Sequence, residues 1–513
     1  MTGPARSASP PARPDSAASA ASLSPSGPSS PAGNAAPGLA LSVLVVTGPA
    51  LRTALLGGLL VAEGAIGTAF TLNAEVQAIL LEAVVLGNLL AVFLLPAMMH
   101  RFTSGRIGVA SAVATVVILA LGMAAGALGV RSGPAATAAL LVGSLAAGFA
   151  VAVLAPVTQI LLNSGTEGNA RATHTLQSLW NAGQPAGFVA ASLIAGVLIG
   201  PLGWGAALIV PLILAVVASV AMVACRLGRP VHEATPAPPP DRTEIALIVM
   251  ALIAFELWST IGTLRSWFGP ACLVALAVTL VSGGYALHGL LTSPAPAISV
   301  TPFRVRSFAM ATLVLFLFQF ATTAEFEVLL LADLAKMSAI DLGDRTAVGN
   351  LAQIAGTALA GLMLVRKAAG AGLLIGLAIT TVGLASYITY PWFDDLFYVT
   401  LTRSIVGFGS GLVTPILFTL ALAAIGPRDH VAAGTWLVIA TVAGTEIGLA
   451  LLDIVLAAAT AITGSDRNGY IGVESMQFLI GLAVALAAAA LLSAMQKQPP
   501  LMTKAAGVTP PPS

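Results

Sequence analysis

The feature that most constrains this chain is a series of apolar stretches, each long enough to cross a lipid bilayer. A spanning helix needs about 20 predominantly apolar residues, and fourteen such stretches follow one another between residues 53 and 495. Only 8% of the residues are charged, whereas a soluble domain carries about 25%. The sequence therefore predicts an all-α polytopic membrane protein. The predicted spans are 53–72, 76–99, 107–130, 135–161, 174–199, 204–225, 243–263, 268–290, 307–335, 346–365, 370–390, 397–424, 431–459 and 474–495.

Polar segments divide the chain into predicted domains. Residues 1–50 are predicted to be a disordered tail rich in Pro, Ala and Ser. Within them, Leu39 to Val46 is too short to span a bilayer and is expected at the interface. The other predicted domains are a six-helix bundle at 51–226, a linker at 227–242, two inserted transmembrane helices at 243–291, a second six-helix bundle at 292–496 and a tail at 497–513.

The distribution of Lys and Arg predicts the orientation. With the N-terminus inside, the inner loops carry eleven of these residues and the outer loops five, as the positive-inside rule requires. We therefore expect a multi-pass protein of the cytoplasmic membrane with both termini cytoplasmic.

Several functional classes lack their usual sequence signals. The net charge of +1 provides no basic field for nucleic acid. The sequence contains no G-x-x-x-x-G-K-[ST] loop, no H-E-x-x-H pattern and no Cys/His cluster. Cys225 and Cys272 fall at opposite ends of different predicted spans and indicate no disulfide framework. We expect no enzyme activity, no catalytic residue, no metal and no cofactor. Any energy that the protein uses is therefore expected to come from an ion gradient.

An internal repeat relates two predicted spans. Residues 144–156 and 403–415 align at a constant offset, so that Gly148 corresponds to Gly407 and Pro156 to Pro415. Transporter halves are commonly repeats, and two six-helix halves separated by two helices would produce this register. Because Gly and Ala are abundant in the chain, coincidence is the alternative.

Three places carry a family resemblance: the loop after the second predicted span, the fourth span, and Glu63 in the first span. The loop from Pro96 to Arg106 is similar to the pattern G-x-x-x-D-R-x-G-R-R and keeps Arg101 and Arg106. Gly148 and Pro156 have the spacing of an R-x-x-x-G motif with a trailing proline. The chain resembles the major facilitator superfamily in these places, and in particular its 14-span drug:proton antiporter branch, over roughly residues 52–495.

The resemblance implies the major facilitator fold, with two bundles that rock around a central site, and it implies proton-driven export. In the first span, Glu63 stands where that branch has a membrane-embedded Asp. Departures occur at His100 and Thr103, which replace Asp and Gly of the loop motif. Ser144 replaces the arginine that the family associates with proton coupling, while Arg403 occupies the equivalent place in the second half.

Acidic residues inside the predicted spans are the main candidates for proton coupling. A mid-bilayer carboxylate costs several kcal/mol and therefore faces a cavity, pairs, or binds a proton. Glu63 and Glu256 are predicted near the centres of their spans, about 16 and 20 Å from the inner ends. Each either carries a proton or makes a buried hydrogen bond, and for Glu256 the structural alternative is preferred.

Further candidates lie in later spans. Glu446 and Asp453, seven residues apart, share one helical stripe, and Arg403 is their expected cation, in either a switching or a static pair. Glu325 and Glu327 lie on different faces of their helix, so at most one is expected to face a central cavity.

A polar stripe in the fifth predicted span is a candidate for substrate contact. Its members lie within about 80° of one another on a helical wheel, and either line a cavity or hydrogen-bond between helices. The substrate-cavity candidates are His174, Gln177, Asn181 and Gln184, together with Glu82 of the second span.

The sequence thus predicts a secondary active transporter that exports a small amphipathic compound in exchange for protons, with Glu63 as the proton carrier. The alternative is a membrane sensor or accessory protein that keeps the transport fold, which the substitutions at His100, Thr103 and Ser144 motivate. Expected partners are a small-molecule substrate, protons and the bilayer, with no nucleic acid. The sequence does not specify the oligomeric state and is compatible with a monomer.

Overall fold

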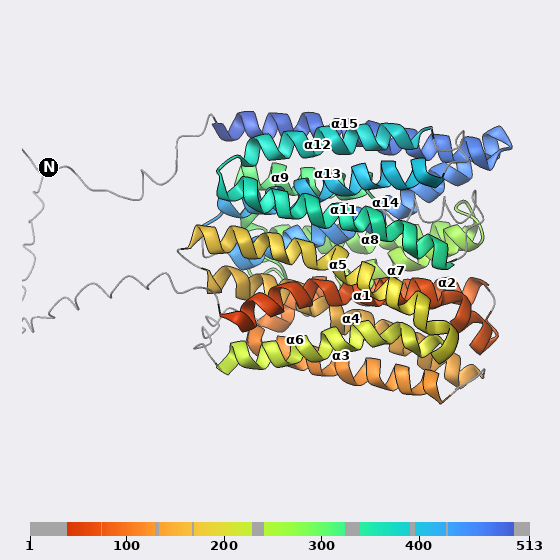
Figure 1. Ribbon diagram of the computed structural model, residues 1–513. Coiled ribbons are helices and arrows are strands. Elements are labelled where there is room, and N and C mark those ends of the chain that lie inside the picture. The colour runs from red at the N-terminus through yellow and green to blue at the C-terminus, as the bar shows by residue number, and fades with distance from the viewer. Residues whose placement is uncertain are drawn as a thin grey trace, which may run out of the picture. The chain divides into compact units, whose positions relative to one another are not determined.

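The computed structural model describes residues 38–72, 74–128, 133–166, 169–227, 241–323, 339–389, 396–426 and 429–496. The predicted tail up to residue 37, most of the predicted linker and the tail from residue 497 lie outside these ranges, as do Glu325 and Glu327. Every regular element within them is helical, and their arrangement is drawn in Figure 1.

The helices of the first half alternate in direction (Figure 1). They are α1 (Leu39–Phe70), α2 (Ala74–Met99), α3 (Ser104–Ala127), α4 (Pro134–Gly165), α5 (Ala170–Leu202), the short η1 (Trp204–Leu208) and α6 (Ile209–Leu227). We call the end of the bundle at which α1 begins and α2 ends the N face, and the opposite end the far face.

The remaining helices continue this alternation. They are α7 (Arg242–Leu264), α8 (Pro270–Thr292), η2 (Thr301–Arg304), α9 (Arg306–Ala321), α11 (Ala339–Val365), α12 (Ala369–Tyr387), α13 (Leu396–Ala423), α14 (His430–Thr463) and α15 (Asp466–Gln496). Within the described residues, thirteen helices are long and apolar enough to span a bilayer, and α9 is shorter. The predicted continuation of α9 lies outside the described ranges.

The first helix differs from the prediction. Leu39 to Val46 was expected to be a separate interfacial segment, with the first span beginning at residue 53, but α1 is one helix of 32 residues. Leu44 and Leu51 are completely buried in it. The prediction was wrong because it placed Arg52 at a membrane boundary. A charged residue is tolerated within a span when it faces the protein interior, and Arg52 does so.

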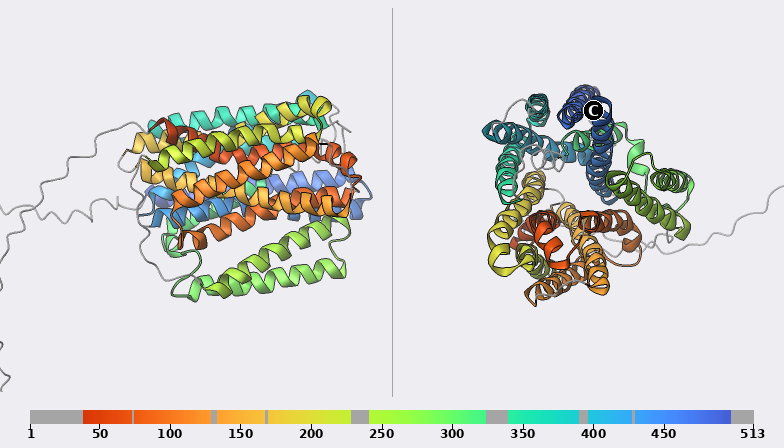
Figure 2. Two further views of the ribbon diagram at one scale, coloured as in Figure 1. Left: turned by 90° about the horizontal axis from the view of Figure 1, so that it is seen from below. Right: turned by 90° about the vertical axis from the view of Figure 1, so that its right-hand side faces the viewer.

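The helices form two six-helix bundles and an inserted pair, as predicted for the major facilitator fold. In the first bundle α1 packs against α4, α5 and α6, and α2 packs against α4. In the second, α13 packs against α11 and α12, and α14 packs against α9 and α15. The bundles meet where α5 contacts α11 and where α2 contacts α14, and the α7–α8 pair contacts the rest chiefly through α2 and α14. Figure 2 shows this arrangement along the helix axes.

The sequence repeat corresponds to a repeated mode of packing. A Cβ atom added to Gly148 of α4 would collide with the carbonyl of Val84 in α2. At the matching position of the second bundle, a Cβ atom on Gly407 of α13 would collide with the carbonyl of Gly349 in α11. Small residues allow helix backbones to approach this closely inside a membrane.

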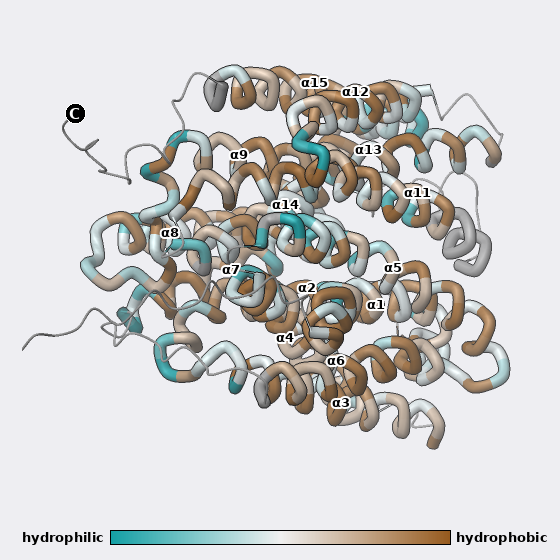
Figure 3. Tube along the Cα trace, turned by 60° about the vertical axis from the view of Figure 1, so that its left-hand side comes forward, coloured by the Kyte–Doolittle hydropathy of each residue, from teal (hydrophilic) through white to brown (hydrophobic). Residues whose placement is uncertain are grey.

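Apolar side chains also cover much of the outer surface. Val117 and Leu121 of α3, Val220 of α6 and Leu486 of α15 are each more than half exposed. Figure 3 shows hydrophobic residues along the length of the helices. Such a surface suits contact with lipid tails, and it leaves the interface between the bundles as the place for a polar site.

Candidate functional site

A cavity lies between the two bundles. Its lining comes from α1, α4 and α5 of the first bundle and from α14 of the second. The lining residues are Pro49, Arg52, Ala155, Trp180, Gln184, Val438, Thr441 and Val442. The part of this space that a water-sized sphere can enter is about 10 Å³, room for roughly one water molecule, so the cavity is much smaller than a typical small-molecule site of about 300 Å³ or more.

Arg52 lies deep in the membrane-spanning body. It is thirteen residues beyond the first residue of α1, or about 20 Å from the N face at 1.5 Å per residue. Among the eight residues that line the cavity, Arg52 is the only charged one. A cation at this depth is costly unless it faces protein or water. Sequence reasoning missed Arg52 because it placed the residue in a loop.

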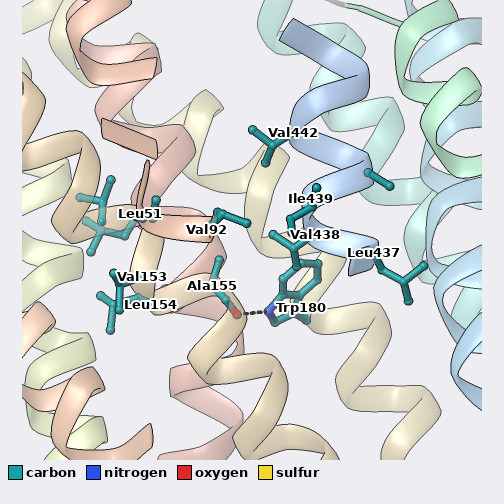
Figure 4. Close-up of a cluster of buried hydrophobic side chains, with 14 of the residues drawn as sticks. Leu51, Val92, Val153, Leu154, Ala155, Trp180, Leu437, Val438, Ile439 and Val442 are labelled. Carbon is teal, nitrogen blue, oxygen red and sulfur yellow. Dashed lines mark hydrogen bonds between the residues drawn. The ribbon is translucent and has the colours of Figure 1, made fainter. Parts of the chain in front are cut away.

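Trp180 lines the cavity on the side of the N face, ten residues beyond the start of α5. Its indole N–H donates to the carbonyl oxygen of Ala155 at 3.2 Å and to Oγ1 of Thr158 at 3.0 Å, both on α4. Its ring centroid lies 5.6 Å from that of Phe418 on α13, in the other bundle. Val438 and its apolar neighbours complete this layer (Figure 4). This layer of side chains therefore links the two bundles between the cavity and the N face.

The residues of the predicted polar stripe of α5 are partly buried between helices and partly at the cavity. Gln177 is buried and accepts a hydrogen bond of 2.7 Å from Nε2 of Gln159 on α4. Asn181, also buried, donates to the carbonyl oxygen of Gln177 at 2.8 Å. Nδ1 of His174 is buried without a hydrogen bond. Only Gln184 lines the cavity, so part of the stripe hydrogen-bonds between helices and part faces the site.

Glu63 lies nearer the far face than predicted. Because α1 begins at Leu39, Glu63 is about 36 Å from the N face and not near the centre of its helix. It is half-buried in a small pocket with Gln77 and Leu80 of α2. Arg52 and Glu63 are eleven residues apart, just over three turns, so they lie on the same stripe of α1.

Four carboxyl groups gather where α2, α7 and α14 meet. Glu82 of α2 and Glu256 of α7 hydrogen-bond to each other, and Asp453 and Glu446 of α14 lie close enough to act on them electrostatically. Asp453 also accepts a hydrogen bond of 2.8 Å from Oγ1 of Thr263 on α7. Glu82, predicted as a cavity residue, thus faces the inserted pair and is not among the residues that line the cavity with Arg52.

Arg403 was predicted to pair with Glu446 or Asp453. It is buried, and its side chain packs over Gly349 of α11, whereas Asp453 faces α7. The expected ion pair stays a prediction.

Glu474 and Gln477 of α15 are fully buried, and sequence reasoning missed both. It began that span at residue 474, whereas α15 begins at Asp466, which places Glu474 two turns inside the helix.

The loop that resembles the family motif joins α2 to α3. Helix α2 ends at Met99 and α3 begins at Ser104. Oγ1 of Thr103 accepts a hydrogen bond from the backbone N–H of Arg106 at 3.4 Å and so caps α3. The residue that replaces the usual glycine therefore has a structural role, because threonine is a favoured N-cap. Arg101 lies exposed in the same loop.

Comparison with known families identifies one match over most of the chain. Residues 46–448 match the family model described as Major Facilitator Superfamily. No curated protein matches the chain.

Solved structures of the same fold include three transporters. An auto-inhibited POT family peptide transporter has 16% sequence identity, with 90% of this chain and 97% of that chain covered and a TM-score of 0.54. The human organic anion transporter MFSD10 (TETRAN) has 14% identity, coverage of 86% and 100%, and a TM-score of 0.56. A bacterial homologue of the iron transporter ferroportin, in an outward-facing state, has 12% identity, coverage of 88% and 99%, and a TM-score of 0.58. At these identities the likeness concerns the fold alone.

Proposed function

This chain belongs to the major facilitator superfamily, and on that premise we propose that it exports a small amphipathic compound in exchange for protons. The family and the transporter structures of the same fold make it a secondary transporter rather than an enzyme. Transporters built from two repeated bundles work by alternating access, in which the bundles rock around a site near the middle of the membrane.

The cavity between the bundles is the observation that carries this proposal. It receives side chains from both bundles and lies at mid-depth, with Trp180 and its contact to Phe418 on the side of the N face. Its lining combines the apolar Val438 and Val442 with the polar Gln184 and Thr441. A mostly apolar site with a few polar groups suits an amphipathic compound.

Glu63 is the proposed proton carrier. It lies on the stripe of α1 that also holds Arg52, between the cavity and the far face. A carboxyl group in a partly apolar pocket can exchange a proton with water that reaches it and is neutral once protonated. Glu446 and Asp453 are further candidates, because they lie beside the Glu82–Glu256 pair at the contact between the bundles.

We further propose that the protein resides in the cytoplasmic membrane with both termini in the cytoplasm. The N face is then cytoplasmic, in agreement with the excess of Lys and Arg in the loops on that side. In this orientation Trp180 lies on the cytoplasmic side of the cavity.

Transport in liposomes tests the proposal. Purified protein is reconstituted with a pH-sensitive dye inside the vesicles, and a pH jump is applied with a panel of charged and neutral amphiphiles outside. We expect substrate-dependent proton flux that a protonophore abolishes. Glu63→Gln should reduce this flux at least tenfold, because it removes the only titrating group of that side chain, and Glu63→Asp should retain most of it.

Asp241→Asn is the matched control. Asp241 is an exposed carboxylate that caps α7, so its loss should leave proton flux unchanged. Parental flux in Glu63→Gln would remove Glu63 from this role. Movement of substrate that ignores the protonophore would refute proton coupling, and failure to move any compound would refute export.

A further inference from the structure

The connection between the inserted pair and α9 is buried at the N face. It comprises residues 293–305, between the end of α8 and the start of α9, and includes η2; we call it the strap. Connecting segments normally run over the surface, yet Ala297 and Ile298 in the middle of the strap are only 2% and 1% exposed. A buried backbone needs hydrogen-bond partners, and helices on both sides of the strap supply them.

Two side chains from different helices hold the same short segment of the strap. Oε1 of Glu244 in α7 accepts a hydrogen bond of 2.8 Å from the backbone N–H of Ala297. Two residues further on, the indole N–H of Trp436 in α14 donates to the carbonyl oxygen of Ser299 at 2.9 Å. The ring of Trp436 also packs edge-on against Phe303 of the strap, with the centroids 5.1 Å apart. The strap therefore links α7 to α14 through a very short stretch of chain.

The linked part of α14 faces the first bundle near the N face. Trp436 is six residues beyond the start of α14, about 9 Å from the N face. Two residues before it, a Cβ atom added to Gly434 would lie 3.8 Å from Cγ of Gln159 in α4. Two residues after it, Val438 belongs to the layer of side chains around Trp180 (Figure 4). Opening of the N face must move this part of α14 away from α4.

The other end of the link is fixed to the first bundle. Helix α7 packs against α2, and Glu256 of α7 hydrogen-bonds to Glu82 of α2. The contacts therefore form a series, in which α2 holds α7, α7 holds the strap, and the strap holds α14. Separation of α14 from the first bundle must break a contact in this series.

We propose that the strap is a tether that keeps the N face closed, with Glu244 and Trp436 as its two attachment points. The inserted pair then takes part in gating, because α7 provides the anchor against which the strap holds α14. This role goes beyond the proposed export, since it concerns what limits the opening of the N face, whatever the protein carries.

The rate at which a buried thiol is modified tests the tether. In the full chain with Cys225→Ala and Cys272→Ala, Ser178→Cys places a thiol where α5 is buried against Gly361 of α11, in the other bundle. The protein is kept in lipid nanodiscs, and N-ethylmaleimide reaches the thiol only after the bundles separate. The rate therefore reports how often the N face opens.

Variants of the attachment points should change this rate. Glu244→Leu and Trp436→Phe each remove one hydrogen bond of the tether, and each should accelerate modification about 2- to 13-fold, the effect of one net hydrogen bond. Glu244→Gln keeps an oxygen that accepts from Ala297 and should leave the rate within about twofold of the parent. Trp267→Phe is the matched control, because Trp267 is buried at the far-face end of the inserted pair, where it packs against Trp258. It should leave the rate unchanged even where it lowers the melting temperature.

The double variant Glu244→Leu/Trp436→Phe distinguishes a tether from two independent contacts. Loss of either contact releases α14, so the double variant should match a single variant, whereas independent contacts would multiply their effects.

Three outcomes overturn the inference: parental rates in both single variants, multiplied effects in the double variant, or equal acceleration by Trp267→Phe. Should Glu244→Leu fail to fold, the comparison of Trp436→Phe with Trp267→Phe still decides. The assay needs neither substrate nor a proton gradient, so its result is separate from the outcome of the transport experiment.

Discussion

The contact between Trp180 and Phe418 is expected to hold the N face closed. The two rings come from different bundles, and their centroids lie 5.6 Å apart at an interplanar angle of 44°. Aromatic pairs contribute about 0.5–1.5 kcal/mol beyond the area they bury. Opening the N face must separate these rings, so their loss should shift the closed-to-open equilibrium by that free energy, or about 2- to 13-fold.

The rate of cysteine modification measures this shift. In a chain whose Cys225 and Cys272 are replaced by Ala, Ser178→Cys introduces a thiol where α5 is buried against Gly361 of α11. A maleimide reaches it only after the bundles separate, so the rate reports the open population. Trp180→Leu and Phe418→Leu should each accelerate modification about 2- to 13-fold.

Two further variants separate the ring contact from other effects of substitution. Trp180→Phe keeps a ring beside Phe418 and removes only hydrogen bonds to α4, which lie within the first bundle, so it should leave the rate near that of the parent. The double variant Trp180→Leu/Phe418→Leu should match a single variant, because both remove the same contact. Unchanged rates in both single variants, or fully multiplicative effects in the double variant, would refute the reasoning.

Two predictions concern stability, measured as thermal unfolding in nanodiscs. Gly148→Val should destabilise the protein by about 1–3 kcal/mol, because its Cβ atom would collide with the carbonyl of Val84. Gly143→Val, at an open position of the same helix, should stay within about 0.5 kcal/mol of the parent. Equal melting temperatures of the two variants would contradict this account. Glu256→Leu should lower the free energy of unfolding by about 1–3 kcal/mol, since it leaves the carboxyl of Glu82 without this hydrogen-bond partner. Glu256→Gln can still donate a hydrogen bond to Glu82 and should lower it less. The reverse order would show that the pair does not hold α7 against α2.

The order and the alternating direction of the helices in the described residues could be predicted from the sequence. In hydrocarbon each backbone N–H and C=O must be satisfied within its own segment, so an apolar run of spanning length becomes a helix whatever its neighbours are. The repeat around Gly148 and Gly407 could also be detected in the sequence, because close helix packing requires small residues at a fixed spacing.

Charged residues inside the helices were harder to interpret. Arg52 was read as the edge of a span because charges usually mark such edges, but the energy of a buried guanidinium depends on what surrounds it in three dimensions. The same error placed the start of the first helix too late, and it therefore placed Glu63 near the centre of that helix instead of near its end. The sequence around Arg52 does not show that this face of the helix is enclosed by other helices.

Apolar length alone thus determined that this chain is a bundle of membrane-spanning helices, because lipid imposes the same requirement on every segment separately. The tertiary structure alone decided which polar side chains meet. It brought Arg52 into a cavity with Trp180 and Thr441, and it joined Glu82 to Glu256 of the inserted pair. These contacts link residues far apart in the chain, and the packing of whole helices, not the pattern within any one of them, sets their distances.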